Sequence, residues 1–297
     1  MVIVRLMGGL GNQLFQYAAG LALSIKNECE LKIDLSAFEN QYGLQTTLRN
    51  PDILHFSLSA KIADAKEASA LRDPLKGVSR ASRFVRQKIF KQYYSDWHPE
   101  VLNKSGDIYL EGYFQCEKYF QDYFDQLSKD FKLRSEFSDL TAEWNERISK
   151  LINPVSLHVR RGDYVSDPRT SALHNICTVN YYLEAIEEMR KRIGNYTLVV
   201  FSDDVEWVRE NLTFGVDTIY VSGSKLIKGL PLLASQELIV MSQCAHHIIS
   251  NSTFSWWGAY LNKRQDKVVL APSLWNRSSI DSHKNILPDS WIRIQIS

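Results

Sequence analysis

Residues 156–164, Ser-Leu-His-Val-Arg-Arg-Gly-Asp-Tyr, bring together the side chains best suited to chemistry in this chain. Apolar and polar residues alternate over 155–159, which is typical of a short β-strand. The strand ends in Arg160 and Arg161, and Asp163 follows after one glycine. Open α/β sheets bind ligands at the carboxyl ends of their strands, and paired guanidinium groups suit phosphoryl anions. We therefore predict an anion site here, with salt-bridged surface arginines as the alternative.

A second polar group, Ser202-Asp203-Asp204, directly follows the apolar run 196–201. If that run is a strand of the same sheet, its end lies near the arginine pair. Asp204 either N-caps the next helix or takes part in binding. Asp203 then remains to accept hydrogen bonds from a base or a ribose.

A third polar group, Ser-Asn-Ser-Thr-Phe-Ser-Trp-Trp, occupies residues 250–257 after an apolar stretch at 246–249. This hydroxyl-rich turn opens a predicted helix, and the free N–H groups of a helix start favour phosphate. Helix capping needs only one of these hydroxyl residues, so capping does not explain the three others and the asparagine. Upstream, the carboxylate of Glu237 is placed to accept the N–H donors of a guanine edge, or it is a surface residue.

The glycine-rich turn at residues 8–13 supports a competing interpretation. Gly9-Leu-Gly11-Asn-Gln-Leu14 reads G-x-G-x-x-L, and Asp34 ends the next predicted strand, as in a dinucleotide-binding fingerprint. Leu14, however, replaces the third glycine, which makes a nicotinamide- or flavin-dependent oxidoreductase the weaker reading. We favour a loop of close approach in which Asn12 and Gln13 present amides to a neutral polyol.

Motifs typical of metal sites are absent from the sequence, which contains neither His-Glu-x-x-His nor Asp-x-Asp. A sugar-nucleotide enzyme that holds its diphosphate through Mg²⁺ or Mn²⁺ commonly needs such a carboxylate pair. We therefore predict no metal and no cofactor, with the diphosphate neutralised by arginines and a helix dipole. Arginine stabilisation of developing phosphate charge is worth roughly 10³–10⁵ in rate.

Two α/β units must position these residues. The first opens with a strand at 2–6, an amphipathic helix and a strand at 31–35. The second begins near residue 153 and alternates strands with helices, which implies a parallel sheet covered on both faces. Its predicted strands are 155–160, 196–202, 217–221, 246–250 and 267–271, and its predicted helices are 179–193, 204–212, 232–244 and 252–262.

Two segments of the first unit have more than one interpretation. The aromatic stretch 109–120 either builds core or stacks against sugar rings. Residues 72–91 carry seven Lys or Arg and one acid. They form either a solvated helix with a core-facing stripe or a basic amphipathic helix that docks on an anionic membrane.

Composition excludes several classes of protein. The 297 residues are 44% hydrophobic and 23% charged, as in a globular chain with room for two cores. A net charge of +1 gives no general attraction to nucleic acid. Four scattered cysteines without a C-x-x-C pair, no signal peptide and no long apolar stretch lead us to expect a cytoplasmic protein with reduced thiols.

Four motifs, taken in order along the chain, resemble glycosyltransferase family 11, the bacterial α-1,2-fucosyltransferases. They are GGLGNQLFQY at 8–17, GYFQCEKYF at 112–120, HVRRGDY at 158–164 and SNSTFSWWGAYLN at 250–262. The resemblance implies a GT-B fold, in which two Rossmann-like domains face a central cleft. It also implies inverting, metal-independent transfer of L-fucose from GDP-fucose to the 2-hydroxyl of a terminal galactoside, in surface-polysaccharide (O-antigen) synthesis.

With this resemblance, we expect a division of labour between the domains. Residues 153–297 would bind GDP-fucose through His158, Arg160, Asp203, Glu237, Asn251, Ser252, Thr253 and Phe254. Residues 1–152 would bind the acceptor, with Gly9, Asn12, Gln13, Glu111 and Gln115 on the acceptor side. The expected acceptor is a galactose-terminated oligosaccharide, either free or linked to a lipid. A lipid-linked acceptor would bring the cytoplasmic enzyme to the inner membrane face.

We expect catalytic roles for Arg160, Arg161 and Asp163, of which the resemblance implies the first two. Arg160 would hold the β-phosphate, with His158 near the nucleoside, and Arg161 would brace the site. Asp163 is the candidate general base for the attacking hydroxyl, or it orients Arg160 through a salt bridge. The alternative class is a non-catalytic glycan- or sugar-nucleotide-binding protein, which would bind GDP-fucose without cleaving it.

Overall fold

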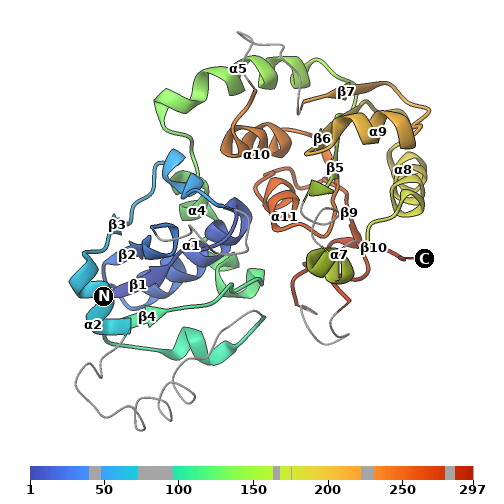
Figure 1. Ribbon diagram of the computed structural model, residues 1–297. Helices are drawn as coiled ribbons and strands as arrows, with labels where there is room; N and C mark the ends of the chain where they lie inside the picture. The colour runs from blue at the N-terminus through green and yellow to red at the C-terminus, as the bar shows by residue number, and fades with distance from the viewer. Residues whose placement is uncertain are drawn as a thin grey trace. The chain divides into compact units, whose positions relative to one another are not determined.

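The computed structural model describes residues 1–39, 48–72, 96–162, 168–174, 176–221, 231–277 and 285–296. The chain divides into two compact units, Met1–Lys132 and Leu133–Ser297, and each is built around its own parallel β-sheet (Figure 1). This architecture confirms the α/β class with parallel strands that the sequence predicts.

The first unit contains a four-stranded sheet of order β3-β2-β1-β4. The strands are β1 (Val2–Arg5), β2 (Leu31–Asp34), β3 (Lys61–Ile62) and β4 (Ile108–Leu110), and helices α1 (Leu10–Lys26), α2 (Ala65–Arg72) and α4 (Phe124–Asp130) accompany them. The predicted strands at 2–6 and 31–35 correspond to β1 and β2. Strands β3 and β4 escape prediction because two or three residues are too few to show a period. In α1 nearly every residue is buried, which makes it the central helix of this unit.

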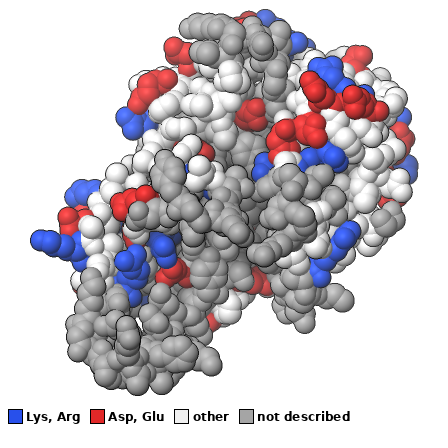
Figure 2. All heavy atoms as spheres, in the orientation of Figure 1, with Lys and Arg blue, Asp and Glu red and all other residues white. Residues whose placement is uncertain are grey.

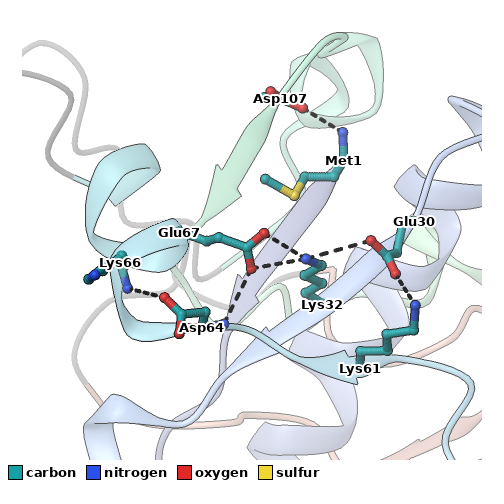
Figure 3. A network of polar contacts seen from close by, with 8 residues as sticks. All are labelled: Met1, Glu30, Lys32, Lys61, Asp64, Lys66, Glu67 and Asp107. Carbon is teal, nitrogen blue, oxygen red and sulfur yellow. Dashed lines mark hydrogen bonds and ion pairs between the residues drawn. The ribbon is translucent and has the colours of Figure 1, made fainter.

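Ion pairs tie the amino-terminal end of this sheet together (Figure 3). The Nζ atom of Lys32 in β2 lies 2.7 Å from Glu67 of α2 and 3.6 Å from Glu30. Glu30 in turn pairs with Lys61 of β3 at 2.7 Å. Because Lys61 and Glu30 are largely exposed, such pairs add little stability and chiefly fix the local arrangement.

The second unit contains a six-stranded sheet of order β10-β9-β8-β5-β6-β7, in which neighbouring strands run parallel. Its strands are β5 (Val155–Val159), β6 (Leu198–Ser202), β7 (Thr218–Tyr220), β8 (His246–Ile248), β9 (Val269–Pro272) and β10 (Ile292–Ile294). Its helices are α5 (Ser135–Ser149), α7 (Pro168–His174), α8 (Val179–Ile193), α9 (Val205–Asn211), α10 (Ala234–Ser242) and α11 (Thr253–Tyr260). Every strand and helix predicted for this half of the chain is present, within a few residues at each end.

Helices cover both faces of the second sheet, and the pleat of β6 divides the core between them. Leu198 and Val200 pack with α8 and α9 on one face. Val199 and Phe201 point to the other face and pack with α5 and α10. This period-two alternation of uniformly apolar residues is typical of a strand buried on both faces.

Helix α5 belongs to the second unit, so the division at residue 132 precedes the expected boundary at 152. Trp144 and Ile148 of α5 are buried against Val240 and Met241 of α10. A polar helix next to a linker-like stretch gave no sign of this packing. The sequence therefore placed the boundary after the helix instead of before it.

Helices of the described part of the chain are all too short or too polar to span a bilayer. Basic and acidic side chains are interspersed on the face drawn in Figure 2, in keeping with the small net charge. Residues 73–91 of the basic segment lie outside the described residues. The four cysteines form no disulfide.

Candidate active site

Three polar segments meet at the carboxyl edge of the second sheet. Strand β5 lies between β8 and β6, and all three run parallel. The residues that follow them, 160–162, 249–252 and 203–204, therefore lie side by side. The sequence predicts that these three segments converge together with Glu237, and the strand order confirms the prediction for the three segments.

Asp203 links both arginines of the β5 loop. Its Oδ2 atom lies 2.7 Å from Nη1 of Arg160, and its Oδ1 atom accepts a hydrogen bond from the backbone N–H of Arg161 at 2.8 Å. About a quarter of each side chain of the Arg160–Asp203 pair is exposed. Because both carboxylate oxygens are engaged in this way, the structure places Asp203 as a brace for Arg160. Its expected contact with a base or ribose would compete with these bonds.

Gly162 leaves the space that this brace occupies. A Cβ atom at residue 162 would lie 2.5 Å from Oδ2 of Asp203 and 3.8 Å from Cζ of Arg160. Any side chain at this position would displace the carboxylate. The glycine of the Arg-Arg-Gly-Asp sequence is thus required by close approach, which the sequence alone does not reveal.

Arg161 is directed to helix α9. Its Nε atom donates to Oδ2 of Asp204 at 3.1 Å, and its guanidinium carbon lies 3.8 Å from the ring centre of Trp207. Asp204 also caps α9 by accepting from the N–H of Trp207 at 3.2 Å, which confirms the capping interpretation. The two adjacent arginines therefore differ: Arg161 joins β5 to α9, whereas Arg160 stays at the sheet edge and pairs with Asp203.

His158 is a buried neutral imidazole one residue inside the strand. It is 5% exposed, and its Nδ1 atom lies 2.8 Å from the hydroxyl of Ser250. Burial, and secondarily the charge of Arg160, lowers its pKa from 6.5 to about 3. Its ring centre lies 5.5 Å from that of Phe254. The ring thus lies between Ser250, which follows β8, and Phe254 of α11, and its low pKa keeps it uncharged at neutral pH.

Asn251 connects the loops around this edge. Its side-chain N–H groups donate to the carbonyls of His174 and Trp275 at 2.9 and 3.0 Å, and its Oδ1 atom lies 3.4 Å from the thiol of Cys177. The residue is 2% exposed. Of the residues expected at GDP-fucose, Asn251 therefore has a structural part.

Ser252, Thr253 and Phe254 lie at the start of α11. Ser252 is the N-cap residue, and its side chain makes no capping hydrogen bond. Thr253 and Phe254 form the first helical positions and are partly exposed. This helix start follows β8, the neighbour of β5, so it lies at the edge where the sequence predicts a phosphate site.

Two residues expected at the site are not part of this cluster of described residues. Glu237 is in the first turn of α10, after edge strand β7, and is partly exposed. Asp163, the candidate base, lies outside the described residues. Among the residues that are described, no three His, Cys, Asp or Glu side chains gather as ligands for a metal ion. Metal independence itself stays a prediction.

The carboxyl edge of the first sheet carries the residues expected on the acceptor side. Gly9 is the N-cap of α1, and Asn12 accepts a hydrogen bond from Gln115 at 2.9 Å. Gln13 is fully buried, donates to the carbonyls of Gly8 and Asn50, and accepts from the N–H of Ile53. Its amide thus holds the glycine turn instead of facing a ligand.

Most of the aromatic stretch 109–120 builds the core of the first unit, because Phe114, Tyr119 and Phe120 are at most 1% exposed. Glu111, at the end of β4, forms an ion pair with Arg5, the last residue of β1. Sequence reasoning missed Arg5, although it ends a strand as Arg160 nearly does. It also left the hydroxyl of Ser250 without a role.

Comparison with known proteins places the chain among glycosyltransferases. The model of glycosyl transferase family 11 matches residues 1–295. An alpha-1,2-colitosyltransferase of Escherichia coli is 32% identical over 99% of each chain, and the O-antigen biosynthesis glycosyltransferase WbnK of Escherichia coli is 30% identical over 97% of this chain and 99% of its own. The galactoside 2-alpha-L-fucosyltransferase Sec1 of Mus musculus is 27% identical over 91% of this chain and 67% of its own.

Solved structures share the fold at much lower identity. The alpha-1,6-fucosyltransferase NodZ, soaked with GDP-fucose, has a TM-score of 0.53 at 14% identity and covers 94% of this chain and 96% of its own. An Arabidopsis thaliana FUT1 mutant in complex with GDP has a TM-score of 0.50 at 11% identity, covering 90% and 69%. The fold is accordingly of the GT-B type found in fucosyltransferases, as expected from the sequence motifs.

Proposed function

The chain belongs to glycosyltransferase family 11, and from this premise we propose that it transfers L-fucose from GDP-fucose to the 2-hydroxyl of a terminal galactoside. The transfer inverts the anomeric centre, needs no metal ion, and serves the synthesis of a surface polysaccharide. The observation that carries the proposal is the braced Arg160 beside the neutral His158, at the sheet edge where the α11 helix begins.

Arg160 stabilises the leaving group in this mechanism. As the bond between fucose and the β-phosphate breaks, the sugar becomes oxocarbenium-like and negative charge grows on the phosphate. A fixed guanidinium and the free N–H groups of the α11 start meet that charge without reorganising. Because Asp203 already holds Arg160, little conformational freedom remains to be lost at the transition state.

His158 contributes a hydrogen bond from an uncharged ring. Its Nδ1 atom is occupied by Ser250, which leaves Nε2 for the nucleotide. A neutral imidazole keeps the site's positive charge on Arg160, near the phosphate that must leave. Asp163 is our candidate base for the attacking 2-hydroxyl. With Asp203 bracing Arg160, the alternative role for Asp163, orienting that arginine, is less needed.

A second donor is favoured by one relative. The 32%-identical Escherichia coli protein is named as a colitosyltransferase, and colitose is L-fucose without its 3-hydroxyl group. GDP-colitose is therefore the second candidate donor. The two differ by one hydroxyl, so a site that hydrogen-bonds this group would reject the deoxy sugar strongly, whereas an apolar contact would discriminate little.

The acceptor follows from the same premise. We assign the amino-terminal domain to a galactose-terminated oligosaccharide and the carboxy-terminal domain to the nucleotide sugar. A lipid-linked acceptor would bring the enzyme to the inner membrane face through residues 72–91. Vesicle sedimentation with anionic lipids tests this contact separately from catalysis.

The central experiment is a donor screen with purified protein and lactose-type acceptors. We expect transfer from GDP-fucose or GDP-colitose, a 2-linked product of inverted configuration, and unchanged rates in EDTA. Arg160→Ala should abolish transfer with an unchanged melting temperature, and Glu188→Gln, which breaks an exposed ion pair on α8, is the control. Loss of activity in EDTA would refute metal independence. GDP binding without turnover would instead support the non-catalytic alternative, and binding of a nicotinamide or flavin would support the oxidoreductase.

A further inference from the structure

Arg5 and Glu111 form a partly open ion pair at the carboxyl edge of the first sheet. Arg5 ends β1, Glu111 follows β4, and these strands are neighbours with Val4 opposite Leu110. Nη1 of Arg5 contacts Oε1 of Glu111, and the two side chains are 26% and 20% exposed. Among the described residues, one nitrogen of Arg5 and one oxygen of Glu111 make the pair. Further donors of Arg5 and the second oxygen of Glu111 are therefore available to another molecule.

A second polar pair borders this one on the same face of the sheet. Arg5 stands opposite Asp34 of β2, and Ile3 stands opposite Tyr109 of β4. The hydroxyl of Tyr109 donates to Asp34 across β1. Burial alone would raise the pKa of Asp34, but hydrogen bonds from Tyr109 and Ser36 outweigh it and hold the pKa below its ordinary value.

Among the residues that the structure describes, the charges of this cluster balance. Arg72 lies 3.9 Å from Asp34, so two arginines face the two carboxylates of Asp34 and Glu111. A cluster without net charge does not attract an anion. Its carboxylate and guanidinium groups instead accept from and donate to hydroxyl groups, and both are planar groups that engage two neighbouring oxygens at once.

We propose that Arg5 and Glu111 form a subsite for two neighbouring hydroxyl groups of a neutral sugar in the acceptor glycan. This inference rests on the proposed function and adds Arg5, and a preference for uncharged acceptors, to the expected acceptor side. Glu111 accepts from one hydroxyl, and Arg5 donates to the oxygen of the next. A uronic acid at this position meets the carboxylate of Glu111 and binds weakly.

The test separates acceptor binding from turnover. Binding of lactose and of methyl β-galactoside to the full chain with GDP present is measured by calorimetry or saturation-transfer NMR, alongside the acceptor KM. We expect Glu111→Gln and Arg5→Gln to weaken lactose binding at least about tenfold. The GDP affinity and the hydrolysis of GDP-fucose without acceptor should stay within about twofold of wild type.

Glu30→Gln is the matched control, because it removes a carboxylate from the Lys61 pair at the other end of the same sheet and should leave lactose binding unchanged. Glu111→Gln preserves the shape of the side chain, and a melting curve confirms that each variant is folded. Unchanged lactose binding in both variants, or tighter binding of a galacturonoside than of lactose, would overturn the proposal. So would a wild-type protein that binds GDP and neither neutral galactoside. Because acceptor binding is measured directly, the experiment tests this subsite even if the enzyme transfers a sugar other than fucose.

Discussion

Replacing Gly162 by alanine should disable Arg160 without removing its charge. The new Cβ would lie 2.5 Å from Oδ2 of Asp203, and ordinary contact begins at 3.4 Å, so the carboxylate must recede by about 0.9 Å. If Arg160 stays in place, its 2.7 Å ion pair then lengthens by up to the same amount, to at most about 3.6 Å, which weakens or breaks the hydrogen bond. A hydrogen bond to a charged group is worth about 1.5–3 kcal/mol, or roughly 10- to 150-fold in a rate constant.

Because Gly162→Ala misplaces the guanidinium and does not remove it, we expect a loss of activity in the lower part of this range. Steady-state transfer from GDP-fucose should lose about 10- to 30-fold in kcat/KM. GDP affinity, measured by calorimetry, should fall by a smaller factor. Asp203→Asn acts on the same contact, so Gly162→Ala should add little to it, and the double variant should lose much less than the product of the single losses.

Two results would refute this reasoning. One is a Gly162→Ala enzyme with wild-type kcat/KM whose crystal structure retains the Arg160–Asp203 contact. The other is full multiplicativity of Gly162→Ala and Asp203→Asn, which would mean that the two changes act independently. Glu188→Gln, on the exposed face of α8, controls for general effects of substitution in the same unit.

Three further outcomes test other parts of the second unit. Arg161→Lys loses the stacking on Trp207, so chemical denaturation should show a loss of about 1 kcal/mol while GDP affinity changes less than about twofold. Gly258→Ala would drive a methyl group of α11 into the methionine side chain of α10, and the free energy of unfolding should fall by about 1–3 kcal/mol in urea titrations, with a stability equal to wild type as the contrary result. Burial lowers the pKa of His158 to about 3 and that of His247 well below 6.5. As the pH falls below about 6.5, these histidines take up protons in the unfolded chain and not in the folded one. The free energy of unfolding should therefore drop towards pH 3 by up to about 1.4 kcal/mol per pH unit for each histidine. A flat stability profile between about pH 7 and about pH 5 would contradict this prediction.

The second unit was predictable because its strands are uniform in character. Residues 196–201 are almost wholly apolar, and the helix expected at 179–193 has the bounds of α8. Parallel strands share one carboxyl edge, so the meeting of Arg160, Asp203 and Ser250 was predictable from the strand positions, whereas the strand order itself was not. These hydrophobic patterns are local in the sequence, and long-range contacts do not alter the elements that they predict.

The roles of individual site residues were less predictable, because they depend on which groups the fold places within hydrogen-bond distance of each side chain. Asp203 was expected at a ligand and is engaged by Arg160 and Arg161. Gln13 was expected to face a polyol and is buried against the 50–53 segment. In both cases the residue type fits either role, and only the three-dimensional arrangement decides between them.

The geometry around Asn251 also affects how the protein ages. An asparagine followed by serine is prone to deamidation, in which the next backbone nitrogen attacks the side-chain carbonyl carbon. Here the N–H of Ser252 is bonded to the carbonyl of Ser250 at 2.8 Å, and the amide of Asn251 is tied to two carbonyls. The attack needs both groups to swing free, so this asparagine should be long-lived in the folded enzyme. Conversion to aspartate would replace the amide nitrogen, which donates both bonds, by a charged oxygen that repels those carbonyls, so that a single spontaneous chemical event would loosen the loops that Asn251 connects.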